Sequence, residues 1–422
     1  MECVFNKYFD PSEVEWSMVE TLIFNDDSCS IDSTERIAYL CLSKLSILLI
    51  YKIIIQTTGV HRINFCIGDD HSDWLEVLMF CLSHYSNLTE LNLGRLTFRG
   101  CLATRLYKFS ETLKTFTLHR IEENFPDWFS DFMNTMNIKT LIVDHFTLHT
   151  PHDGYMGCPF PLYSYKLETI RVKGDAYVLL SDDETEVDFR TAPSNMDSCF
   201  AFSGIKPSPM IDLYVLTELV IRDCSINDRD FIEISTNVTS LLKLDISGCV
   251  RLSHRGLNHL ENLTNLTDLS LGYLDVEYES IQSLTDLKYL DVSYIDPLKI
   301  QLFSLMYNLL ELRTVVSCGN VPRNVVSREI RNYIRSDIGS LNRRVDKLTR
   351  DITLYSETVL IQILQSSNIP GLNLVSITDG DVSPAIKQVY LDHNTRRSDL
   401  CQMLGYWLRR DNFGPVLEAR ES

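Results

Sequence analysis

The sequence has too few basic residues for a general nucleic-acid-binding protein. It contains 39 Lys and Arg against 57 Asp and Glu, which gives a formal net charge of -18 at pH 7. Binding to nucleic acid requires a basic surface that neutralises phosphates, and this composition lacks one overall. A local basic patch stays compatible with the composition, but we expect no nucleic acid among the partners.

Paired cysteine motifs are also missing. Twelve cysteines are scattered from Cys3 to Cys401, with no CxxC pair and no zinc-finger spacing. Isolated cysteines fit reduced thiols better than a disulfide framework. The first residues, MECVFNKYFDPSEVEW, lack the basic start and the apolar run of a secretory leader. The sequence therefore predicts a cytoplasmic or nuclear protein.

One apolar stretch invites comparison with a membrane span. Residues 37–55, IAYLCLSKLSILLIYKIII, approach the roughly 20 residues that cross a bilayer. Lys44 and Lys52 interrupt the stretch, and lysines near the centre of a span are costly in lipid. We favour a buried helix that runs into a strand, and expect no membrane contact; insertion into lipid is the alternative.

Motifs that carry catalysis are absent as well. The sequence has no GxSxG nucleophile elbow, no HExxH metal motif and no glycine-rich phosphate loop. His145 and His149 have the spacing of a helical metal site, but they adjoin the strand-like phrase TLIVDHF, where that spacing loses its meaning. We expect a protein that is not an enzyme and needs no cofactor or metal.

What the sequence does contain is a repeat. A phrase of the form LxxLxL recurs mostly at intervals of about 25 residues, within the 20–29 of a leucine-rich repeat. The phrases begin at Leu88, Leu113, Ile138, Leu167, Leu216, Leu241, Leu266 and Leu287. Fainter copies begin at Val60 and Leu309. Within the first phrase Leu88, Leu91 and Leu93 should point inward and Glu90 and Asn92 outward, as in a strand with one buried face.

The predicted fold class is α/β, a leucine-rich-repeat solenoid with parallel strands on a concave face. Residues 60–320 form the solenoid, with an acidic insertion near 176–212 that contains SDDETEVD. Residues 1–59 are predicted to be an N-terminal helical segment. Residues 321–422 are predicted to form a C-terminal helical cap, because Val325, Ile330, Ile334, Ile338 and Leu341 follow helical spacing.

Outward residues of the strands are the candidate binding site for a protein substrate. Basic residues gather in the earlier repeats and carboxylates in the later ones, a gradient that selects a partner electrostatically, while tyrosines supply aromatic anchors. The candidates are His119, Arg171, Lys173, Arg222, Asp245, Asp268, Tyr273, Tyr289 and Asp291. The alternative is that they are ordinary solvated positions. Cys224 and Cys249 follow the strands and should serve the turns.

Ahead of the repeats, residues 34–49, TERIAYLCLSKLSILL, are predicted to be a helix capped by Ser30 or Ser33. Ile37, Cys41 and Leu45 would lie on one stripe, which resembles the BC box that binds elongin C. Together with the later phrases LDISGC and LKYLDVS, this pattern resembles the Zyg eleven family of substrate receptors of cullin-2 ubiquitin ligases. The resemblance covers roughly residues 37–312.

This resemblance implies a non-catalytic subunit that recognises a substrate for a cullin-2-type ubiquitin ligase. The N-terminal helix would dock on elongin C through Ile37, Cys41 and Leu45, and the repeats would hold the substrate. The family's armadillo-like helices would correspond to a truncated version in residues 321–422. A repeat scaffold that binds proteins without any ligase is the alternative function.

Overall fold

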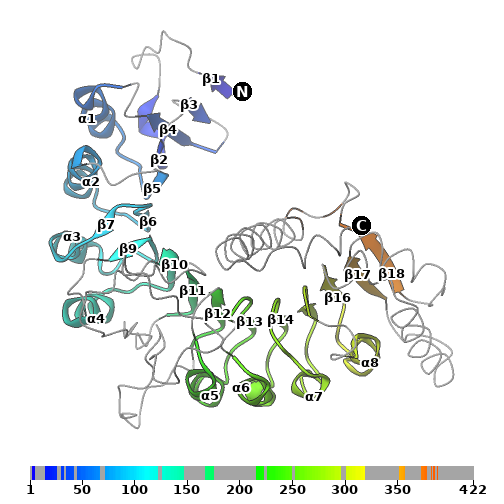
Figure 1. Ribbon diagram of the computed structural model, residues 1–422. Coiled ribbons are helices and arrows are strands. Elements are labelled where there is room, and N and C mark those ends of the chain that lie inside the picture. Colours follow the sequence, from blue (N-terminus) through cyan, green and yellow to red (C-terminus); the bar gives the residue numbers. More distant parts are fainter. Residues whose placement is uncertain are drawn as a thin grey trace, which may run out of the picture. The chain divides into compact units, whose positions relative to one another are not determined.

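The structure is a computed structural model in which the chain divides into two compact units, unit 1 (Met1–Thr267) and unit 2 (Asp268–Ser422). Figure 1 shows the helices and strands of both. The structure describes residues 2–4, 15–25, 30–32, 35–41, 45–66, 72–121, 126–146, 167–174, 215–222, 226–249, 252–295, 301–318, 351–356 and 372–377, together with 382, 384 and 387. The acidic insertion near 176–212 and the helix predicted over 325–341 lie outside these residues.

Unit 1 is built on a sheet whose later strands are parallel and follow one another in chain order. These strands are β5 (Arg62–Cys66), β6 (Glu90–Asn92), β8 (Thr115–Leu118), β10 (Thr140–Phe146), β11 (Thr169–Gly174), β12 (Glu218–Arg222) and β13 (Lys243–Asp245). A second sheet pairs β7 (Thr97–Phe98) with β9 (Arg120–Ile121). Each long connection returns the chain to the same end of the sheet, where the next parallel strand begins, as a solenoid requires.

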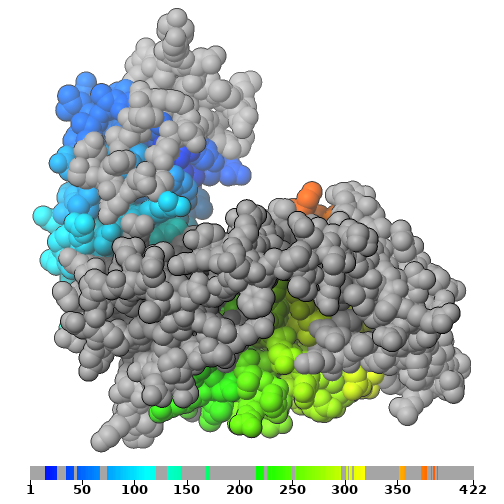
Figure 2. Space-filling view, in the orientation of Figure 1, coloured from blue at the N-terminus to red at the C-terminus, as the bar shows by residue number. Residues whose placement is uncertain are grey.

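Helical connections lie along one side of the unit 1 strands (Figure 1). They are α1 (Ile47–Gln56), α2 (Ser72–His84), α3 (Gly100–Leu106) with η3 (Tyr107–Phe109), α4 (Pro126–Thr135), α5 (Asp228–Asn237), and α6 (His254–Leu257) with η5 (Asn258–Asn262). In the space-filling view the blue-to-cyan residues of the first repeats lie next to one another in chain order (Figure 2). Helices on one side and strands on the other define a leucine-rich-repeat architecture.

The core of unit 1 is a ladder of apolar side chains, one from each repeat. Paired positions in neighbouring strands place Leu91, Phe116, Leu141, Ile170, Leu219 and Leu244 in one row. Every residue of this row is buried. The eight residues predicted to begin the phrases, from Leu88 to Leu287, are buried as well, which confirms the repeat. Glu90 is exposed and Leu93 buried, so the predicted alternation is also confirmed.

Within its described residues, unit 2 has the same pattern in five parallel strands. They are β14 (Asp268–Ser270), β15 (Tyr289–Asp291), β16 (Thr314–Ser317), β17 (Ile352–Ser356) and β18 (Leu372–Ser376), with helices α7 (Tyr278–Ile281) and α8 (Leu302–Asn308). The register aligns Leu290 with Val315, so the phrase before β16 begins at Leu312 and the predicted start at Leu309 is wrong.

The region predicted to be a C-terminal helical cap contains two strands, so that prediction is wrong for the residues of β17 and β18. β17 pairs with β16, and β18 pairs with β17, both in parallel. Ile352 and Leu354 are buried and Thr353 is half-buried, which is strand alternation. β17 does not carry the LxxLxL phrase, whereas IPGLNL at residues 369–374 matches it with Ile in place of the first Leu and leads into β18. The pairing that makes both segments strands comes from residues distant in the sequence.

The N-terminal segment also differs from its prediction, because its described residues contain four strands as well as helices. β4 (Ile37–Cys41) and β2 (Thr21–Asn25) are parallel neighbours, while β1 (Glu2–Val4) and β3 (Ser30–Asp32) add antiparallel pairs. A short helical turn, η2 (Trp16–Met18), precedes β2. The repeat sheet therefore begins within residues 1–59.

The BC-box-like helix predicted over residues 34–49 is wrong at Ile37 and Cys41, which lie in β4. The helix of this region is α1, whose N-cap is Ser46, with its hydroxyl accepting a bond from the Leu49 N–H at 3.3 Å. Two residues that are four apart lie on the same face both in a strand and in a helix. The spacing of Ile37 and Cys41 therefore fits a strand as well as the predicted helix. The order is also the reverse of the predicted helix followed by a strand.

Among the helices that the structure describes, none has both the length and the apolar character needed to cross a membrane. The stretch at residues 37–55 is divided between β4 and the ten-residue α1.

Gly94 sets the path of the chain as it leaves β6. Its φ is +53°, and a Cβ added there would lie 1.9 Å from the carbonyl oxygen of Phe65 in the preceding strand. The Asn92 side chain accepts a bond from the Gly94 N–H at 2.8 Å. The turn after β6 can approach β5 this closely because Gly94 has no side chain.

We expect Gly94→Ala to lower the free energy of unfolding by more than about 2 kcal/mol, since it adds both backbone strain and a backbone clash. Urea denaturation followed by circular dichroism measures this. Gly59→Ala is the control, because its Cβ would meet carbonyl oxygens at 3.4 Å, an ordinary contact. Equal effects of the two substitutions would contradict the assigned role of Gly94.

Candidate functional site

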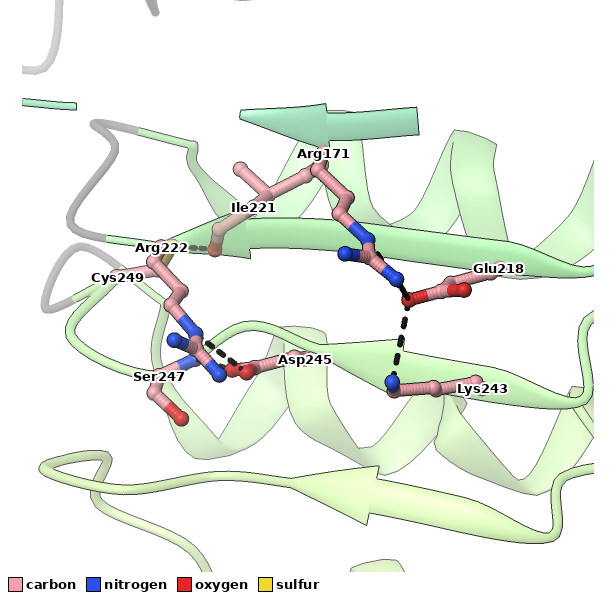
Figure 3. Close-up of polar contacts among 8 residues, drawn as sticks. All are labelled: Arg171, Glu218, Ile221, Arg222, Lys243, Asp245, Ser247 and Cys249. Carbon is pink, nitrogen blue, oxygen red and sulfur yellow. Dashed lines mark hydrogen bonds and ion pairs between the residues drawn. The ribbon is translucent and has the colours of Figure 1, made fainter. Parts of the chain in front are cut away.

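Three charged side chains of unit 1 form a row across β11, β12 and β13 on the sheet face that carries the polar residues (Figure 3). Arg171 reaches Glu218 Oε1 through its Nε at 3.1 Å and through its second guanidinium nitrogen at 3.0 Å. Lys243 Nζ reaches the same oxygen at 3.1 Å. One carboxylate thus holds two cations, and we call these three residues the charge ladder.

A second ion pair lies one step further along the same strands. Arg222 Nε is 2.5 Å from Asp245 Oδ2 (Figure 3). The other carboxylate oxygen of Asp245 accepts a bond from the Ser247 N–H at 3.1 Å. The Asp245 side chain is 3% exposed and that of Arg222 is 29% exposed. The Asp245 carboxylate is therefore buried and fully used in contacts within the fold, whereas part of the Arg222 side chain remains at the surface.

The two groups together leave local positive charge on this face. Arg171, Arg222 and Lys243 supply three positive charges, and Glu218 and Asp245 supply two negative ones, which leaves a net charge of +1. Arg171 and Lys243 are each 47% exposed, against 18% for Glu218. Because the cations are the more exposed partners, this surface presents N–H donors toward solvent in a chain that is acidic overall.

Threonines extend the polar face toward the N-terminus. The sheet register places Thr115, Thr140 and Thr169 in the row that continues into Glu218. Each is half-buried. Lys139 and Glu168 form a further exposed pair at 2.8 Å. Such exposed pairs typically contribute about 0.2–1 kcal/mol each to stability, so this face tolerates substitution.

Asp245 and Asp291 were predicted to contact a substrate, but both are buried at 2% exposure, and that prediction is wrong. Each accepts a bond from the N–H two residues later, from Ser247 at 3.1 Å and from Ser293 at 3.0 Å. Ser293 also donates its hydroxyl to Asp291 at 2.6 Å. Asn92 makes the same bond to Gly94, so these side chains close the turn after each strand.

In unit 2 the predicted residues gather around tyrosines. Asp268 pairs in register with Tyr289, and both are half-buried. Tyr273 follows β14 and its ring stacks on that of Tyr294, with centroids 4.5 Å apart and planes 7° apart. Tyr289 and Tyr294 both pack against the buried core of Val316, Cys318 and Ile377.

The remaining predicted residues lie in different surroundings. His119 is half-buried just after β8. Lys173 pairs with Arg222 through the backbone of β11, and its side chain lies outside the described residues. Cys249 is buried and its thiol donates to the Ile221 carbonyl at 3.1 Å, which confirms its role in the turn (Figure 3). Cys224 lies outside the described residues.

Two thiols have a raised pKa. Partial burial raises the pKa of Cys66 against the opposing effect of a bond to the Asn64 side chain. Full burial raises the pKa of Cys81. A free thiol already titrates above neutral pH, so both remain protonated and are poor nucleophiles. Within the described ranges, no group of three or more His, Cys, Asp or Glu could hold a metal ion.

Glu218, Lys243 and Tyr294 are the residues that the candidate set omitted. Glu218 and Lys243 stand at the same outward place in consecutive phrases, LTELVIRDC and LLKLDISGC, so the repeat pattern alone predicts both on one sheet face. Tyr294 differs, since its contact with Tyr273 depends on turn geometry that the phrases do not specify.

No protein-family model matches the chain, and no curated protein matches it in sequence. Among solved structures, it is similar to the Rad7 and Elc1 complex in yeast, at 15% identity and a TM-score of 0.36, over 68% of this chain and 77% of that chain. It is also similar to an internalin (InlF) from Listeria monocytogenes str. 4b F2365, at 15% identity and a TM-score of 0.36, over 85% of this chain and 83% of that chain. The fold assignment rests on the strand ladders described above.

We expect Arg222→Ala to destabilise unit 1 by about 1–3 kcal/mol, because it removes the charged partner of a buried carboxylate. Urea unfolding midpoints with their slopes measure the change. Arg229→Ala is the control, since Arg229 is 71% exposed and its pair with Glu233 lies on a helix surface. The control should cost less than about 0.5 kcal/mol. A neutral Arg222→Ala would show that Asp245 does not need this ion pair.

Proposed function

We propose that this protein is a non-catalytic recognition protein that binds an acidic segment of a partner protein on the polar sheet face of unit 1. The observation that carries the proposal is the charge ladder, in which Arg171 and Lys243 are held on either side of Glu218 and remain half exposed. Function in repeat proteins resides in such surfaces rather than in the fold.

The charge ladder is suited to recognition because it holds its cations in place before a partner arrives. Glu218 is the less exposed member and accepts bonds from both neighbours, which restricts two long side chains that would otherwise move freely. A partner carboxylate meets positioned donors, and the guanidinium of Arg171 can bind it in a bidentate manner. Arg222 adds further N–H donors along the same strands, because its side chain is 29% exposed although it is paired with the buried Asp245.

We expect Arg171→Glu/Lys243→Glu to weaken binding of a fluorescein-labelled peptide of ten Glu and Asp residues by at least about tenfold in 50 mM salt. Fluorescence anisotropy with the full chain measures the dissociation constant. The affinity of the wild-type protein should fall as salt is raised, as screening requires.

The charge-matched control is Arg105→Glu/Arg229→Glu, which alters two exposed residues on helices α3 and α5 of the same unit. This control should retain most of the affinity. An equal loss in both double variants would mean that the peptide responds to net charge alone, and the polar face would then not be the site.

We also propose, as the more specific function, a substrate-recognition subunit of a cullin-2-type ubiquitin ligase that binds elongin C. The resemblance of the phrases LDISGC and LKYLDVS supports it. The adaptor contact through Ile37 and Cys41 has to be revised, because both belong to β4 and Cys41 is buried. Helix α1 follows directly, and its Leu48 and Ile55 are 70% and 55% exposed, one face of a helix available to an adaptor.

If this ligase assignment is right, elongin B and elongin C should be retained by the purified wild-type chain and lost by Leu48→Asp/Ile55→Asp. Pull-down with and without cullin-2 measures this, and circular dichroism checks that the variant is folded. Leu242→Asp/Leu310→Asp is the matched control, because both leucines are exposed and lie outside α1, and this variant should still bind. A folded wild-type chain that retains no elongin C would leave the protein a recognition scaffold without a ligase.

A location in the cytoplasm or nucleus belongs to both versions of the proposal. Six cysteines within the described ranges are free thiols, and Cys66 and Cys101 among them are exposed. Exposed free thiols are typical of a reducing compartment. The absence of catalytic motifs in the sequence supports a protein that acts by binding.

A further inference from the structure

Two tyrosines at the strand ends of unit 2 adopt a backbone conformation that tyrosine rarely takes. Tyr273 has φ +66° and Tyr294 has φ +61°. Gly248 occupies the corresponding position after β13, with φ +76°. The left-handed region suits glycine and disfavours a bulky side chain. Tyrosine stands at this position in two successive repeats, where glycine would fit without strain.

Backbone bonds to the next strand hold both tyrosines in this conformation. The Tyr273 N–H donates to the Ser293 carbonyl at 3.0 Å, and the Tyr294 N–H donates to the Cys318 carbonyl at 2.8 Å. Tyr294 also packs on the core formed by Val316, Cys318 and Ile377. The result is a parallel pair of half-buried rings, which we call the tyrosine pair, anchored on the Tyr294 side.

The chain around the tyrosine pair is strongly acidic. Apart from the buried Asp291, residues 268–295 contain five acidic residues and one basic residue, Lys288. Asp275 lies two residues after Tyr273 and is exposed, and Asp268 lies on β14, the strand that Tyr273 follows. The charge of this segment is therefore opposite in sign to that of the charge ladder in unit 1.

We propose that the tyrosine pair and its neighbouring carboxylates form a second binding surface, which takes an arginine-bearing segment of a protein partner. A guanidinium is planar, stacks on an aromatic face and pairs with carboxylates, so it matches both features of this surface. An acidic or neutral segment finds no complementary charge here. Tyr289, half-buried and packed on the same core, supplies further aromatic area beside it.

This surface is separate from the one assigned under the proposed function. It lies in unit 2, it rests on aromatic side chains, and it selects the opposite charge. An arginine peptide and an acidic peptide therefore report on the two surfaces independently, and failure of one leaves the other intact.

The test uses the full chain and a fluorescein-labelled peptide of alternating glycine and arginine, with anisotropy as the readout. Tyr273→Gly should weaken binding about three- to tenfold, since it removes one ring of the pair. Its thermal midpoint should not fall, because glycine accepts the left-handed backbone. Asp275→Asn should weaken binding as well. A lysine peptide of equal charge should bind the wild-type chain less tightly, because ammonium does not stack on a ring.

Tyr107→Ala is the matched control, because Tyr107 is an exposed tyrosine of unit 1, and it should leave the affinity unchanged. If Tyr273→Gly lowers the thermal midpoint, Tyr273→Asn repeats the measurement, since asparagine also tolerates this backbone and has no ring. The proposal would be overturned if these variants bound the arginine peptide as tightly as the wild-type chain does, or if the lysine peptide bound the wild-type chain equally well. Either result would mean that the peptide is attracted by net charge alone.

Discussion

The structure depends on the burial of a row of apolar side chains in each unit, to which each repeat contributes a side chain. In unit 1 this row runs through Leu91, Phe116, Leu141 and their neighbours, and in unit 2 it runs through Leu269, Leu290 and Val315. A single repeat of about 25 residues cannot bury such a side chain by itself, because its neighbours form the walls. Stability and strand register are therefore collective properties of the array.

Once this row is buried, alternation along each strand determines which residues lie on the opposite face of the sheet. The neighbouring residues point away from the apolar row, so they are free to vary in charge and become the recognition surface. The turns add a second constraint. Asp245, Asp291 and Asn92 each accept a bond from the N–H two residues later, which ends the strand and removes these side chains from recognition. Residues that bind a partner must therefore lie at positions that belong neither to the buried apolar row nor to the turns that end the strands.

The two proposed binding surfaces follow from the same rule with different side chains. In unit 1, Lys243 in register with Glu218 and Arg171 reaching it from the strand on the other side place cations on both sides of Glu218. In unit 2, the position after the strand carries tyrosine instead of glycine, and Tyr273 stacks on Tyr294. A repeat architecture provides equivalent positions, and the side chains placed on them determine which partner each unit selects.

The sequence by itself determined the repeat, the buried positions and the α/β solenoid, because the LxxLxL phrase carries the burial pattern locally. It also indicated the turn role of Cys249. Tertiary structure decided the rest. Ile37 and Cys41 lie in a strand because β2 pairs with them, β17 and β18 are strands because β16 starts their ladder, and the buried Asp245 carboxylate is paired with Arg222 of the preceding strand. Each of these outcomes depends on a partner distant in the sequence, which local periodicity does not encode.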